Sequence, residues 1–132
     1  MKKIYYAKTH ADFLNQAFGT NYKAWMKGRW NFNEYTWVWI VRMDGATRDG
    51  WVNKIINENE IHELYTWENE PSYSNEYERP YRIAVQVIDL PDGEREYHVL
   101  GKYQFDFNQS TDRKHVLIKI QNTEEIYTKR RK

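Results

Sequence analysis

The stretch TWVWIVRMDGATRDGWVN, residues 36–53, carries the strongest structural signal in this chain of 132 residues. In its first half tryptophan alternates with valine and isoleucine, which is the two-residue period of a β-strand. Both alternating sets are apolar, so residues 36–43 are predicted to form a central strand that is covered on both faces. The two Asp-Gly pairs that follow are typical of turns and predict a returning partner strand over residues 51–56.

The residues on either side of this stretch predict one helix and a further strand. Residues 9–26 have a helical pattern, with Thr9 suited to the N-cap, an apolar face after it, and Gly19 suited to the C-cap. Residues 61–67 fit either a helix or a strand, and we favour a strand because the segment contains Tyr and Trp.

The second half of the chain predicts a hairpin and a last strand. Residues 81–90 and 96–107 alternate around the turn PDGE, and residues 115–120 form the last apolar run. The predicted fold is one α+β domain over the whole chain, mostly β, in which about five strands form a strongly bent sheet or small barrel with an N-terminal helix. Residues 128–132 are expected to be a basic disordered tail.

Composition excludes several classes of protein. With 20 Lys and Arg against 19 Asp and Glu, the net charge of +1 excludes a histone-like binder that depends on phosphate neutralisation. The absence of cysteine excludes disulfides and thiolate metal sites. Because MKKIYYAKTH is followed by no apolar run, we expect a cytoplasmic protein with no membrane partner. Aromatic residues make up 17% of the chain, and Tyr and Trp suit half-exposed binding sites as well as cores.

Two segments resemble a known superfamily. The segment RIAVQVIDLPDGEREYHVLGKYQFDFNQSTDRKHVLIKI, residues 82–120, resembles the closing hairpin and last strand of PUA-like barrels, which include the SRA, EVE, ASCH and YTH domains. The segment VWIVRMDGATRDGWVN, residues 38–53, looks like small domains of this kind encoded near HNH nucleases and in phages or mobile elements. The resemblance implies a compact barrel with a concave aromatic pocket for a flipped or single-stranded base, often a modified one. It assigns no residue of this chain to that pocket.

An aromatic platform is the first candidate site. A base stacked on one ring gains ~1–3 kcal/mol. The candidate rings are Trp30, Tyr35, Trp37, Trp39 and Trp51. Alternating tryptophans on a strand are usually core residues, so a core role for the rings on the predicted strand stays open.

Polar residues near the platform are candidates for reading a base and holding its phosphates. The Asn53 carboxamide offers both a donor and an acceptor to a base edge, and Asp49 could accept from an amino group. The candidate phosphate-binding residues are Arg42, Arg48, Lys23, Lys27 and Arg29.

The sequence gives little indication of catalysis. The four histidines lack the spacing of a zinc protease motif, and the glycines form no phosphate-binding loop. The cluster of Glu60, His62 and Glu63 lies on a polar stretch that is predicted to face solvent. The acidic residues from Asp89 to Glu96 fit a hairpin better than a metal site. We therefore expect a protein that is not an enzyme and that uses no metal and no cofactor.

The expected function is a non-catalytic nucleic-acid-binding module that stacks a flipped or single-stranded base, modified bases included, in phage or bacterial defence or counter-defence. One alternative is a phage or mobile-element inhibitor that binds a host defence protein through exposed aromatic residues. A second alternative is a pocket for a free nucleotide or signalling molecule. Exposed aromatic residues are also compatible with a homodimer.

Overall fold

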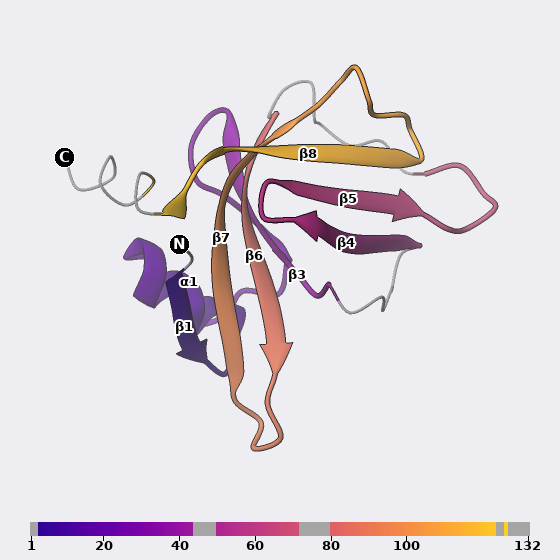
Figure 1. The fold of residues 1–132 in the computed structure, drawn as a ribbon. Helices are drawn as coiled ribbons and strands as arrows, with labels where there is room; N and C mark the ends of the chain where they lie inside the picture. Colours follow the sequence, from indigo (N-terminus) through magenta and orange to yellow (C-terminus); the bar gives the residue numbers. More distant parts are fainter. Residues whose placement is uncertain (1–2, 44–49, 72–79, 124–125, 127–132) are drawn as a thin grey trace.

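The computed structural model describes residues 3–43, 50–71, 80–123 and 126. Within these ranges the chain forms one long, strongly curved and unclosed sheet, with a helix close to the N-terminus (Figure 1). The elements in chain order are β1 (Lys3–Ala7), α1 (His10–Phe18), β2 (Arg29–Asn31), β3 (Thr36–Val41), β4 (Trp51–Asn57), β5 (Glu60–Tyr65), β6 (Tyr81–Asp89), β7 (Arg95–Phe105) and β8 (Lys114–Gln121).

The predicted fold class is confirmed, and the described part of the chain has more strands than expected. The strands at the centre and in the second half match the predicted segments, and the ambiguous segment at 61–67 is the strand β5. Strands β1 and β2 were not predicted, because β1 is short and mostly exposed and β2 has only three residues.

The order of strands in the sheet is β2-β3-β6-β7-β8-β5-β4, and β1 pairs with β7 off this path. The pair β3 and β6 is parallel, and all the other pairs are antiparallel. Strand β3 therefore lies between two neighbours, as its two apolar faces predicted.

The long strand β7 produces the bend of the sheet. One edge of β7 pairs with β1 over residues 95–99 and with β8 over residues 102–105. Between these parts Leu100 is an extra residue opposite β6, because Val99 pairs with Val85 and Gly101 pairs with Ala84. Such a bulge bends a strand and increases its twist. As a result β8, β5 and β4 run across the far ends of β6 and β7 (Figure 1).

Helix α1 has the caps that the sequence predicted, but the helical pattern that continued after Gly19 forms no helix. The Thr9 hydroxyl accepts a hydrogen bond from the Asp12 amide at 3.1 Å, and Gly19 ends the helix with a φ of 71°. Residues 20–28 contain no helix. The chain is instead turned back, because the Asn15 side chain bonds both the amide and the carbonyl of Tyr22. The predicted helix between the caps Thr9 and Gly19 is therefore confirmed, and the helical pattern over residues 20–26 was wrong.

The two faces of the sheet hold two separate cores. The outer core lies between α1 and β1, β3, β6 and β7; its larger members include Phe13, Leu14, Phe18, Ile40, Ile83 and Tyr97. The inner core lies inside the curve and draws on β3, β5, β6, β7 and β8; its members are Trp37, Trp39, Ile61, Ala84, Tyr103, Phe105 and Leu117. No helix in the described ranges is long and apolar enough to span a membrane.

We expect a substitution of Gly101 by Ala to destabilise the fold. Gly101 has a φ of 141°, and a Cβ there would lie 2.8 Å from the Gln121 carbonyl oxygen. Strain and close contact together are expected to lower the free energy of unfolding by about 3 kcal/mol, measured by urea denaturation.

The matched control is Gly93→Ala, which also has a positive φ of 87° but whose Cβ would meet no atom within 4 Å. It is expected to cost only about 1 kcal/mol. If both variants lose the same free energy of unfolding, the close approach of β7 and β8 at Gly101 does not require a glycine there.

Candidate functional site

Side chains from the two halves of the sheet meet inside its curve, on a surface that we call the inner face. Strand alternation and register explain which residues lie there. Trp51 and Asn53 alternate along β4 and pair with Tyr65 and Glu63 of β5, and Glu63 in turn pairs with His115 of β8. The inner face consists of Trp37, Trp39, Trp51, Asn53, Glu63, Tyr65, Arg82, Phe105 and His115.

A buried ionic network lies at the centre of the inner face. Arg82 Nη1 donates to Glu63 Oε1 at 3.2 Å, and His115 Nδ1 lies 2.8 Å from the same oxygen. The side chains of Arg82 and Glu63 are only 2% and 11% exposed. Strands β5 and β6 are not neighbours in the sheet, so this contact joins the two sides of the curve directly.

The Glu63 carboxyl is held in its ionised form. Burial alone would raise the pKa of Glu63, but the positive charge of Arg82 and the hydrogen bond to His115 outweigh burial and lower this pKa below its ordinary value. Glu63 is therefore a fixed anion inside the protein. Its second oxygen, Oε2, makes no hydrogen bond with the described residues.

Arginine side chains cover the two tryptophans of β3. The Arg82 guanidinium carbon lies 4.6 Å from the ring centre of Trp37 and 4.8 Å from that of Trp39. Arg29 lies over Trp37 as well, at 4.5 Å. Both indoles are buried. In this conformation they form the floor of the inner face, and the stacking platform expected on Trp37 and Trp39 is already occupied by guanidinium groups.

Trp51 is a half-exposed ring of the inner face, like Tyr65. It stacks on His115, with ring centres 4.4 Å apart and planes 27° apart, and it lies 5.1 Å from the tilted ring of Tyr65. His115 also meets Phe105 edge-on at 4.9 Å. The network under Trp51 thus fixes the orientation of an indole that stays partly accessible to solvent.

Asn53 carries an unmatched acceptor beside this network. The residue is 9% exposed, and its side-chain oxygen Oδ1 is buried without a hydrogen-bond partner. A buried acceptor without a partner costs ~1–3 kcal/mol of stability, so its presence calls for a reason. A ligand that donates a hydrogen bond to Asn53 would supply one.

The other predicted aromatic and acidic site residues do not join the inner face. Trp30 packs against Phe18 on the side of helix α1, and its indole N–H donates to the Tyr22 hydroxyl at 2.9 Å. Tyr35 is exposed in the turn before β3. Asp49 lies outside the described residues.

The predicted phosphate-binding residues lie in different environments. Arg42 forms a two-point ion pair with Asp89, at 2.8 and 3.1 Å, and is therefore already engaged. Lys23 and Lys27 are exposed between α1 and β2, and Arg29 is exposed at the start of β2. Arg48 lies outside the described residues.

The sequence analysis missed Glu63, Arg82 and His115. The expectation that Glu60, His62 and Glu63 share a solvent-exposed face was wrong for Glu63, since alternation along β5 turns Glu63 inward and leaves the other two on the opposite face. Glu60 and His62 form a hydrogen bond of their own there. The available signal was the period of two along β5, which separates Glu63 from His62. Among the residues described here, no three His, Cys, Asp or Glu side chains form a group able to hold a metal ion.

Comparisons with known proteins support the fold. No protein-family model matches the chain, and no curated protein matches it in sequence. Its structure is similar to that of the 5-hydroxymethylcytosine-specific restriction enzyme AbaSI, with a TM-score of 0.61 and 22% sequence identity. The match covers 89% of this chain and 38% of that one, so the chain corresponds to well under half of that enzyme. This likeness supports the predicted fold, a mostly β domain with a strongly bent sheet and an N-terminal helix.

We expect Glu63→Gln to weaken the fold in a pH-dependent way. Removing the charge takes away the carboxylate that the buried Arg82 guanidinium contacts, which is expected to cost about 3 kcal/mol at pH 7. Because the folded state lowers the pKa of Glu63 below 4.5, the carboxylate gives its full stability above that value and loses it as the pH falls through the folded-state pKa. The stability difference between wild type and variant should therefore shrink below pH 4.5 in urea denaturation.

The control is Asp112→Asn, which removes an exposed carboxylate of the β7–β8 connection that is not part of this network. It should change the free energy of unfolding by less than about 0.5 kcal/mol. A Glu63→Gln difference that stays constant from pH 7 to pH 3 would contradict the role given to this carboxylate.

Proposed function

We propose that this chain is a nucleic-acid-binding module whose inner face takes one single-stranded or flipped base, modified bases included. The observation that carries the proposal is the buried, unpartnered Asn53 acceptor beside the ionised Glu63 and the half-exposed Trp51. A stacking ring next to matched polar groups is the arrangement by which proteins hold an unstacked base.

The polar groups favour a base edge that carries an amino group. Asn53 and Glu63 are direct partners across β4 and β5, so their side chains lie next to each other. Both Arg82 and His115 bond Oε1 of Glu63, which leaves Oε2 as an acceptor. Carboxylates accept from the amino group of cytosine, and a carboxamide can both donate and accept. A cytosine, including one modified at the ring carbon beside the amino group, is therefore the first candidate, and the specificity of AbaSI for 5-hydroxymethylcytosine agrees with it.

Stacking and backbone contacts would supply the rest of the affinity. A base on Trp51 gains ~1–3 kcal/mol, whereas unstacking a base from a duplex costs a few kcal/mol, so single-stranded or weakly paired targets are favoured. Lys23, Lys27 and Arg29 are the candidates for phosphate contacts. With a net charge of +1, binding should fall with salt less steeply than for a strongly basic protein.

This proposal includes no reaction. The inner face is assigned to binding alone, and the module would detect modified or foreign nucleic acid in phage or bacterial defence or counter-defence. The alternative function is binding to a protein partner. The surface that favours it is the exposed ring of Trp67, whose centre lies 6.3 Å from the centre of the Tyr65 ring.

We expect Asn53→Leu to separate binding from stability. Leucine keeps the side-chain volume and removes the unpartnered buried oxygen, so the free energy of unfolding should rise by about 1 kcal/mol. Binding of a fluorescein-labelled cytosine-containing single strand, measured by anisotropy at low salt, should weaken at least tenfold. A purely structural Asn53 would instead give lower stability and unchanged binding.

We expect Trp51→Ala to weaken the same binding by about tenfold or more, because a stacking ring is lost. The control is Tyr6→Ala, which removes an exposed ring from β1, away from the inner face, and should leave the affinity unchanged. If single-stranded, duplex and base-modified oligonucleotides all fail to bind the wild type at low salt, the proposal is wrong, and a stable complex with a protein would then favour the alternative.

A further inference from the structure

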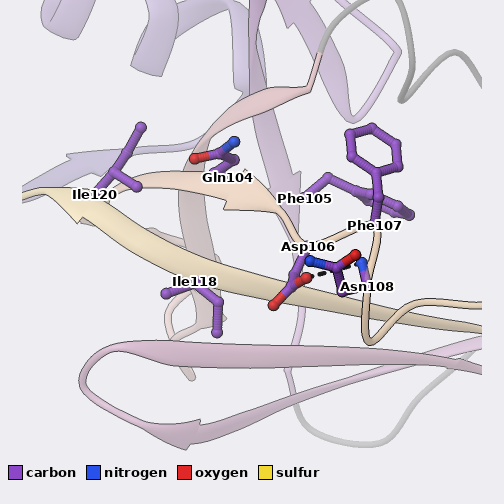
Figure 2. A pocket seen from close by; sticks show the side chains of 7 residues that line it. All are labelled: Gln104, Phe105, Asp106, Phe107, Asn108, Ile118 and Ile120. Carbon is purple, nitrogen blue, oxygen red and sulfur yellow. Dashed lines mark hydrogen bonds between the residues drawn. The ribbon is translucent and has the colours of Figure 1, made fainter.

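A second concave site lies on the opposite face of the sheet from the inner face. It is a cleft of about 370 Å³ where β7 ends, β8 passes and the chain turns between them (Figure 2). Gln104 and Ile118 are direct partners across β7 and β8, and their neighbours Tyr103 and Leu117 point into the inner core. The cleft is lined in part by Gln104, Asp106, Phe107, Asn108, Ile118 and Ile120.

Two carboxamides in the cleft are available to a ligand. The side chains of Gln104 and Asn108 are exposed and make no hydrogen bond within the described part of the chain. Each carries two N–H donors and an acceptor oxygen. In Figure 2, Gln104 lies on strand β7 and Asn108 lies in the turn that follows it.

Asp106 adds a fixed negative acceptor. Its carboxylate accepts the Gln109 side-chain amide at 2.7 Å and the Asn108 backbone amide at 3.0 Å. The hydrogen bond from Gln109 is the main cause that lowers the pKa of Asp106 below its ordinary value. None of the residues that line the cleft is cationic, so the cleft does not suit a phosphate group.

Apolar side chains complete the cleft. Ile118 and Ile120 of β8 both line the cleft, and Ile120 is 44% exposed. The ring of Phe107 is 39% exposed and lies 4.8 Å from the ring of Phe105. An apolar wall with a few placed polar groups, in a volume of this size, is typical of a small-molecule site.

We propose that this cleft binds a nucleobase as an uncharged group, either as a free nucleoside or as one base of a single strand. The flat ring lies against Ile118, Ile120 and the Phe107 ring. Its edge hydrogen-bonds the carboxamides of Gln104 and Asn108, and an amino group on the base donates to Asp106. The site is separate from the inner face and does not depend on the function proposed there.

The test follows the side-chain amide resonances of Gln104 and Asn108 in the ¹⁵N-labelled full chain. The probes are adenosine, cytidine, guanosine and thymidine, followed by a short mixed-sequence single strand. We expect both carboxamides to shift with saturation, and the double variant Gln104→Ala with Asn108→Ala to bind at least tenfold more weakly. Both residues are exposed, so this variant should fold normally.

Two controls separate this site from the rest of the molecule. Gln16→Ala removes a carboxamide from α1 and should leave the affinity unchanged. Asn53→Leu alters the inner face and should also leave the cleft titration unchanged, so that either proposal can fail alone. Saturation at lower concentration by nucleosides than by the strand identifies free nucleosides as the source, and the reverse identifies a base of a strand. No shift at either carboxamide with any probe, or an unchanged affinity in the double variant, overturns the proposal.

Discussion

The inner face depends on one buried carboxylate, that of Glu63 between Arg82 and His115. These residues come from β5, β6 and β8, and two strands of the sheet lie between β5 and β6. The ion pair therefore sets how closely the curved sheet approaches itself. Because the same guanidinium also lies on Trp37 and Trp39, one contact fixes both the curvature and the aromatic floor.

A network of this kind is a costly way to stabilise a fold. Removing two charges from water costs several kcal/mol for each ion, and well-packed apolar residues often do as well or better. Asn53, with a buried oxygen that has no partner, adds a further cost. Polar groups that lower stability and lie around the half-exposed Trp51 are characteristic of a binding site. In such a site, function limits how far the residues can be optimised for stability.

Much of the scaffold could be predicted from the sequence, because period and capping are local signals. The alternation over residues 36–43, the caps Thr9 and Gly19, and the hairpin around PDGE were all correct. Of the polar residues of the site, Asn53 was named from the sequence, but Glu63, Arg82 and His115 could not be predicted, because their contact depends on register between distant strands. Glu63 and His115 are 52 residues apart and meet only because β5 pairs with β8.

The division into two cores has a consequence for how such domains diversify. Helix α1 and its apolar partners occupy the outer side of β3, β6 and β7, whereas the side chains proposed to read a base project from β4 and β5, which contribute no residue to the outer core. The helix-covered layer and the proposed reading positions thus lie on different strands of the same sheet. Mutational drift at the reading positions can change which chemical group is recognised while the helix-covered layer continues to hold the strands in place.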